Sequence, residues 1–211
     1  MKKILIFICF MGVLMGFTHC SKDDSENETI VLLGEEGYVP PLMDLIPDTM
    51  HTTFPTHFGD FFEGYIPPNI EGEYQIDNKF SFSNIFQELN DTLEMHLKIS
   101  DQHNRIATIE LDEGGIVRTD TAYIMGSESS FTLYFVEDRD RNFSGFHYIE
   151  KHVVVFSGEK TAEGIKGLRT GFITLVSNES NNNNVTGLPP GCYFVYYDLD
   201  NISENCNWFD P

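Results

Sequence analysis

The chain has 211 residues, and its 33 acidic side chains outnumber 13 basic ones, giving a formal net charge of −20 at pH 7. Such an excess of negative charge repels nucleic acid and anionic lipid, and no basic cluster offsets it. We therefore expect neither as a partner. The length suits one domain of ordinary size with shorter flanking segments.

A short basic start precedes an apolar run from Ile4 to Phe17. A membrane-spanning helix needs about 20 residues, so this run is too short to span a bilayer. It has the basic and apolar regions of a secretory signal, and polar residues at helical spacing, expected of a buried helix, are missing. The sequence predicts that residues 1–19 form a cleaved signal peptide. Their removal takes away Lys2 and Lys3, and the formal charge changes from −20 to −22.

The run ends at Cys20, and the acidic stretch "SKDDSE" follows directly. A cysteine at this boundary resembles the lipobox of bacterial lipoproteins, although His19 stands where a small residue is usual. A lysine followed by acidic residues resembles the export signal of Bacteroidota surface lipoproteins. The resemblance implies lipid attachment at Cys20 and a lipid-anchored protein of the outer membrane exposed at the cell surface. The periplasmic face is the alternative. Several acyl chains give a stable anchor.

Besides Cys20 and the cysteine of the predicted signal peptide, the chain has two cysteines, Cys192 and Cys206. Outside the cytoplasm such a pair favours a disulfide over a metal site, and the pattern predicts a bridge between them. Two free thiols are the alternative.

Residues 20–68 are interpreted as the lipidated cysteine, a polar tether and a lead-in rich in proline and aromatic residues. Prolines oppose helix interiors and central strands, yet the aromatic content is too high for a disordered linker. We expect residues 54–65 to be irregular and to pack against the domain that follows, residues 69–211.

From residue 70 the pattern changes to a period of two. Residues 92–99, "TLEMHLKI", alternate apolar and polar side chains as in a half-buried strand, and His96 is expected on the exposed face. Further strands are predicted at residues 73–76 continuing to 79–82, 107–111, 130–136, 145–156, 167–176 and 192–199. One short helix fits residues 83–91. The sequence thus predicts an all-β domain of about eight antiparallel strands, a barrel or a sandwich.

The segment "PPNIEGEYQI" opens this domain with Gly72-Glu73-Tyr74. It resembles the first strand of lipocalin-like (calycin-type) barrels, in which a Gly-x-Trp or similar pair closes the barrel floor. The "PPNIEG" opening also resembles uncharacterised lipocalin-like lipoproteins of Bacteroidota. Here tyrosine replaces tryptophan, and the arginine that often stacks on it has no identifiable counterpart. The resemblance extends over residues 67 to about 200 and favours a lipocalin-like β-barrel over a β-sandwich.

Aromatic side chains are predicted to line the barrel interior: Tyr74, Phe80, Phe82, Phe131, Phe135 and Tyr193. An eight-stranded barrel either is filled by its own side chains or holds one small ligand. The sequence therefore favours a surface-anchored binding protein for a small apolar molecule. The alternative is a filled barrel that binds a protein or glycan at the cell surface.

No sequence motif points to catalysis. The chain has neither the Gly-x-Ser-x-Gly nor the Cys-x-x-Cys pattern, and its glycines do not form a phosphate-binding loop. A calcium-type spacing at residues 138–149 fails because Phe143 and Ile149 occupy the glycine and glutamate positions. We expect a non-enzymatic protein with no catalytic residue, metal or cofactor.

Overall fold

The computed structural model describes residues 40–86, 92–143, 146–178 and 188–209, all within one compact unit. The predicted signal peptide, Cys20 and the tether lie outside the described residues. So does most of the helix predicted at residues 83–91, where Ser83 ends a strand and Asn84–Phe86 are not helical.

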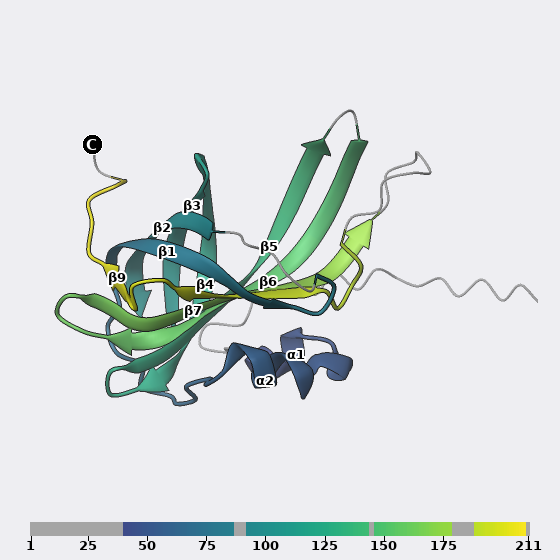
Figure 1. Cartoon of the computed structure of the whole chain (residues 1–211). Helices are drawn as coiled ribbons and strands as arrows, with labels where there is room; N and C mark the ends of the chain where they lie inside the picture. Colours follow the sequence, from purple (N-terminus) through teal and green to yellow (C-terminus); the bar gives the residue numbers. More distant parts are fainter. Residues whose placement is uncertain (1–39, 87–91, 144–145, 179–187, 210–211) are drawn as a thin grey trace, which may run out of the picture. The chain divides into compact units, whose positions relative to one another are not determined.

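Nine strands form one antiparallel sheet (Figure 1). Their bounds are β1 Gly72–Ser83, β2 Thr92–His103, β3 Ile106–Glu113, β4 Ile116–Ser127, β5 Ser130–Phe143, β6 Phe146–Lys160, β7 Gly164–Asn178, β8 Tyr193–Asp198 and β9 Ile202–Glu204. Strands β1 to β6 pair in chain order, β8 pairs with both β1 and β7, and β6 pairs with β7. This ring is a closed antiparallel eight-stranded β-barrel with β9 as an extra strand on β7. The predicted barrel is confirmed.

We call the two ends of the barrel the floor and the mouth. The floor is the end where β1 begins, at Gly72, and the mouth is the end where β1 ends, at Ser83. Alternating apolar residues point inward as predicted in β2, β3 and the first half of β5. Strand β4 was missed in the sequence because Arg118 and Asp120 occupy its inward positions toward the mouth and hide the alternation.

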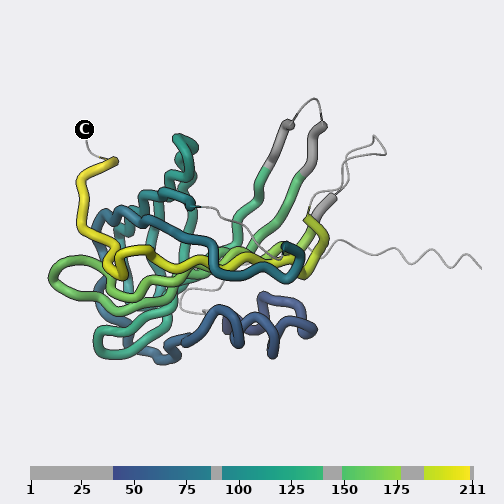
Figure 2. Tube along the Cα trace, viewed as in Figure 1, coloured from purple at the N-terminus to yellow at the C-terminus, as the bar shows by residue number. Residues whose placement is uncertain are grey.

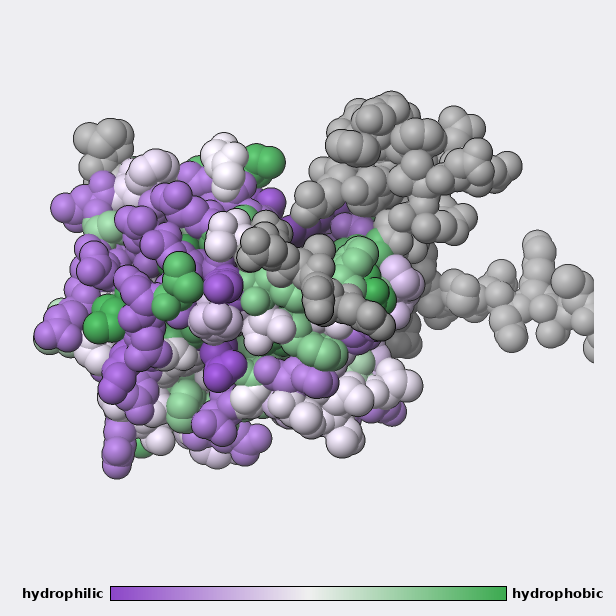
Figure 3. All heavy atoms as spheres, viewed as in Figure 1, coloured by the Kyte–Doolittle hydropathy of each residue, from purple (hydrophilic) through white to green (hydrophobic). Residues whose placement is uncertain are grey.

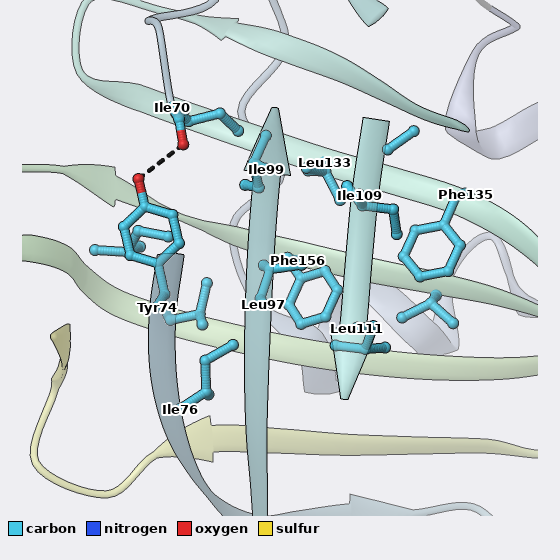
Figure 4. Packing of buried hydrophobic residues seen from close by; sticks show 14 of the residues in the cluster. Ile70, Tyr74, Ile76, Leu97, Ile99, Ile109, Leu111, Leu133, Phe135 and Phe156 are labelled. Carbon is cyan, nitrogen blue, oxygen red and sulfur yellow. Dashed lines mark hydrogen bonds between the residues drawn. The ribbon is translucent and has the colours of Figure 1, made fainter. Parts of the chain in front are cut away.

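The floor half of the barrel is filled by one apolar cluster (Figure 4). Tyr74 is fully buried there, and its hydroxyl donates to the carbonyl oxygen of Ile70 at 2.7 Å. Lys160 Nζ donates to the same hydroxyl at 2.7 Å and lies 4.7 Å from the ring centroid. Gly72 has a φ of +152°, and a Cβ there would lie 2.8 Å from the Tyr74 hydroxyl, so the Gly-x-Tyr spacing is a steric requirement. The basic residue that lies over the Tyr74 ring is therefore Lys160, in place of the arginine that often stacks there in lipocalin-like barrels.

The lead-in packs on the outer face of β5–β8 through short helical turns: α1 Leu42–Leu45, η1 Asp48–Met50 and α2 Thr53–Phe58. Phe54 and Phe58 are fully buried, and a Cβ at Gly171 of β7 would lie about 3 Å from both rings. Pro55 is tolerated because it lies in the first turn of α2, where the N–H has no intrahelical acceptor. The path of the lead-in beneath the barrel strands can be followed in Figure 2. Packing of the predicted stretch is confirmed for Phe54 and Phe58, whereas Tyr65 is exposed, and residues 54–58 are helical rather than irregular.

The C-terminal segment covers the outer face of β2 and β3. The Trp208 ring stacks on His96 with 3.8 Å between centroids, and its Nε1 donates to Asp112 Oδ2 at 2.9 Å. His96 is consequently buried, so the expectation that it is exposed was wrong. In Figure 3 hydrophilic residues prevail toward the left of the view, whereas pale and hydrophobic residues gather near the centre, beside the residues drawn grey.

Candidate functional site

The barrel is parted between β4 and β5 toward the mouth. These strands pair only from Tyr123 with Tyr134 to Ser127 with Ser130. Beyond that point the structure records no pairing between residues 116–122 of β4 and residues 135–143 of β5, within the described part of the chain. We call these two stretches the seam. Figure 1 shows the mouth ends of β5 and β6 diverging from β3 and β4.

The pairing ends where like charges would face each other. Continuing the register from Tyr123 and Tyr134 would set Asp120 opposite Glu137 and Arg118 opposite Arg139. Like charges directly opposite each other on one face destabilise an antiparallel pair. Because all four side chains belong to the inward-facing set, the continued ladder would also bury these repulsions.

Opposite charges join the strands instead, through five residues that we call the charge cluster: Glu113, Arg118, Asp120, Glu137 and Arg139. Arg118 Nη1 lies 2.9 Å from Glu113 Oε2 and 3.3 Å from Glu137 Oε2. Arg139 Nε donates to Glu137, and Arg139 Nη2 lies 3.1 Å from Glu113 Oε2. The Arg139 guanidinium is also 5.3 Å from the centroid of the Phe172 ring. Side chains thus span the seam where the backbone ladder has ended.

Asp120 is the excess acid of this cluster. Partial burial raises its pKa to about 6, with further increases from the charges of Glu137 and Asp138 and an opposing effect from Arg118. Two arginines face three carboxylates, so the cluster gains a negative charge when Asp120 ionises. The site favours a cation over an anion.

A second polar array lies next to the cluster on β6 and β7. His152 Nδ1 is 3.4 Å from Thr174 Oγ1, and its Nε2 is 3.2 Å from Glu150 Oε2. Burial lowers the pKa of His152, as does the charge of Arg139, so the ring favours its neutral form. The order hydroxyl, imidazole, carboxylate is that of nucleophilic catalysis. All three side chains are buried, and the backbone N–H of Leu188 donates to Glu150 Oε1 at 2.8 Å.

The predicted interior residues divide into two groups. Tyr74, Phe131 and Phe135 belong to the core, and Phe80 packs against it. Phe82 and Tyr193 lie instead on the outer face under α2: Phe82 stacks on His57 at 3.5 Å, and Tyr193 meets Phe54 edge-on at 5.4 Å.

The misplacement has a local cause. A bulge between Phe80 and Phe82 shifts β1 by one residue relative to β8, so the two phenylalanines point to opposite faces. In β8 the inward residues are Phe194 and Tyr196, and the assignment of Tyr193 to the interior was wrong.

The interior of the floor half has no room for a ligand. Tyr74, Leu97, Leu133 and Phe156 each expose 0% of their surface, so not even a water molecule touches them. The inward residues of β3, together with Phe131 and Phe135, expose at most 2% of their surface. These aromatic residues fill the barrel rather than line a cavity.

The predicted disulfide is wrong. Cys192 and Cys206 are free thiols. The carbonyl oxygen of Cys192 accepts from Thr174 near the mouth, whereas the N–H of Cys206 donates to Glu73 at the floor. A disulfide needs Cα atoms within about 7 Å, and the length of β1 separates these two positions. Burial raises the pKa of both thiols.

The described residues include no group of three or more His, Cys, Asp or Glu side chains that could hold a metal ion. They also include no helix with the length and apolar character needed to span a membrane. The side chains of residues 140–148, which contain most of the calcium-type spacing, lie outside the described part.

Comparison with known protein families, characterised proteins and solved structures found no match for this chain. The fold and site therefore define the protein by themselves, as a closed antiparallel β-barrel with a filled floor half and a charge-lined seam at its mouth. Sequence reasoning missed the charge cluster. The signal was present in "IVRTDTA", where charged residues replace apolar ones at the alternate positions of a β-branched stretch.

Proposed function

We propose that this protein is a non-enzymatic, lipid-anchored lipoprotein of the outer cell surface whose barrel binds a macromolecular partner, a protein or a glycan. The location rests on the sequence: the apolar run before Cys20, the cysteine itself and the acidic stretch after it. The resemblance of Gly72-Glu73-Tyr74 to lipocalin-like lipoproteins of Bacteroidota supports the same assignment.

The filled floor half is the observation that carries the choice of partner. A carrier of a small apolar molecule encloses most of its ligand in a pocket lined by apolar side chains. Here the inward apolar residues of the floor half contact one another and leave almost no accessible surface, whereas Phe80, Leu93 and Phe194 are only partly buried. The filled floor half therefore supports binding at the mouth or on the outside of the barrel, which suits a large partner.

Binding of an apolar dye to the full chain in detergent micelles tests this choice. We expect no saturable one-to-one binding above that of the micelles alone. One-to-one binding that is lost when Leu133 or Phe156 is changed would overturn the proposal in favour of a carrier.

The anchor is tested by fractionation of Cys20→Ala beside the matched control Cys206→Ala. We expect Cys20→Ala to leave the membrane fraction and the control to remain there, accessible to protease added to intact cells. A membrane-bound Cys20→Ala protein would contradict the lipoprotein assignment, and protection of the control from protease would indicate the periplasmic face.

A further inference from the structure

The edge of β4 at the seam presents backbone groups to solvent. The N–H of Ile124 donates to the carbonyl oxygen of Arg105 at 2.8 Å, so even-numbered residues of β4 direct their backbone groups toward β3. Backbone direction alternates along an antiparallel strand. Val117 and Thr119 therefore direct their N–H and C=O groups into the seam, where no described residue pairs with them, whereas the N–H of Thr121 donates to the Asp120 carboxylate.

The protection of this edge against pairing consists of inward-facing charges. Exposed edges are commonly blocked by proline, lysine, a bulge, a covering segment or inward-pointing charged residues, and here Arg118 and Asp120 disfavour an apolar strand while leaving room for one with a complementary charge. Residues 116–122 contain neither proline nor lysine, and their pairing with β3 continues without a bulge. Val117, Thr119 and Thr121 are exposed, and β-branched residues such as these favour extended pairing.

The charge beside the edge selects the occupant. Asp120 faces inward on the same stretch, with Glu137 and Asp138 nearby. Arg118 is already paired with Glu113 and Glu137, and Lys151 lies 3.5 Å from Asp138. A second copy of this chain would bring two strongly acidic molecules together, whereas a basic side chain would pair with Asp120.

We propose that the edge of β4, residues 116–122, receives an extended peptide segment of a partner protein, which adds as a strand and places a lysine or arginine beside Asp120. The inference rests on the proposed function and narrows it from a macromolecule to a protein. Strand addition supplies affinity through backbone hydrogen bonds and specificity through alternate side chains. Seven residues of edge match a typical strand of about 5–6 residues.

Selection of random linear peptides on the full chain in detergent micelles tests this inference. The enriched peptides are synthesised and titrated against wild type, Thr119→Pro, Thr119→Ala and Asp120→Asn. Proline removes the N–H that points into the seam and leaves the side bonded to β3 intact, so we expect Thr119→Pro to weaken binding at least about tenfold. Thr119→Ala should bind like wild type, and Asp120→Asn should weaken basic peptides only.

Hydrogen exchange completes the test. Bound peptide should slow exchange of the Val117 and Thr119 amides in wild type. Failure to enrich any peptide, equal binding by Thr119→Pro when its circular dichroism and melting match wild type, or protection elsewhere overturns the inference. Should Thr119→Pro fail to fold, N-methylation of alternate residues of the peptide must abolish binding to wild type.

The proposed function is judged separately. Cross-linking on intact cells that captures a reproducible partner equally well with Thr119→Pro would retain the proposed function and reject the seam as its docking site. Concentration-dependent dimerisation that Thr119→Pro abolishes would reject the partner peptide in favour of a second copy. Absence of any partner together with no peptide binding would reject both.

Discussion

Arg118 of β4 and Glu137 of β5 lie 3.3 Å apart, Nη1 to Oε2, across a seam where the two strands share no backbone pairing in the described chain. Glu137 is almost completely buried and also accepts from Arg139. The contact explains how a parted barrel keeps its shape toward the mouth. Glu137, like Glu113, contacts both arginines, and it is the more deeply buried of the two carboxylates.

Glu137→Gln should therefore be destabilising. The amide gives up the charge that both arginines contact, and a hydrogen bond to a charged group contributes about 1.5–3 kcal/mol, while Glu113 still contacts both arginines. Glu110→Gln is the matched control, because Glu110 is half-buried and only 3.6 Å from Lys98, and such a pair contributes about 0–1 kcal/mol. Urea unfolding of both variants measures the difference. Similar losses in the two variants would show that the cluster contributes no more than a surface pair.

The contribution of Asp120 and Asp198 to stability should fall as the pH rises from about 4 to about 6, opposite in sign to that of His152. Asp120 and Asp198 have pKa values raised to about 6 from 3.8, mainly by burial, so the folded state binds their protons more tightly than the unfolded state does. Their contribution to the free energy of unfolding then decreases across this window and levels off above it. Asp120→Asn should flatten the decrease. A profile with the same slope in the variant would contradict the raised pKa of Asp120.

The Tyr74 hydroxyl should matter for the floor. Tyr74→Phe leaves Lys160 and the Ile70 carbonyl without their shared partner, and burial already lowers the pKa of Lys160. An unsatisfied buried polar group costs about 1–3 kcal/mol. Adding Lys160→Met to Tyr74→Phe should recover part of the loss in thermal unfolding. Additive losses in the double variant would show that the two side chains act independently.

The lead-in should be part of the folded barrel unit. Phe58→Ala removes a fully buried ring that stacks on Phe54 at 5.1 Å, and such truncations cost about 3–5 kcal/mol. Phe62→Ala is the control, since Phe62 is only half-buried. Chemical denaturation should show one transition in both variants, at a much lower midpoint for Phe58→Ala. Separate transitions would indicate that the lead-in folds apart from the barrel.

The sequence revealed those parts of the fold in which side-chain alternation reports burial. Strands such as β2 and β3 have an apolar inward face and polar outward face, so their orientation followed directly from Leu97 and Ile109. Strand β4 was not predicted because its inward residues near the mouth are charged. The bulge after Phe80 and the long distance between Cys192 and Cys206 depend on register, which is a tertiary property.

The candidate site was hidden for the same reason. Glu137 and Arg139 follow an apolar stretch of β5 without any break. The local sequence does not indicate that these two charged side chains still point into the barrel. Only the pairing with β4 shows that like charges would face each other. Such a conflict between pattern and burial is where functional sites are expected.

Amide hydrogen exchange of the free protein along β4 tests the parted seam most directly. The account predicts slow exchange at Arg118, Asp120 and Ala122, whose N–H groups face β3, and fast exchange at Val117 and Thr119, whose N–H groups face the seam. Uniformly slow exchange from Val117 to Ala122 would show that β4 and β5 remain paired to the mouth, and would contradict both the seam and its proposed docking role.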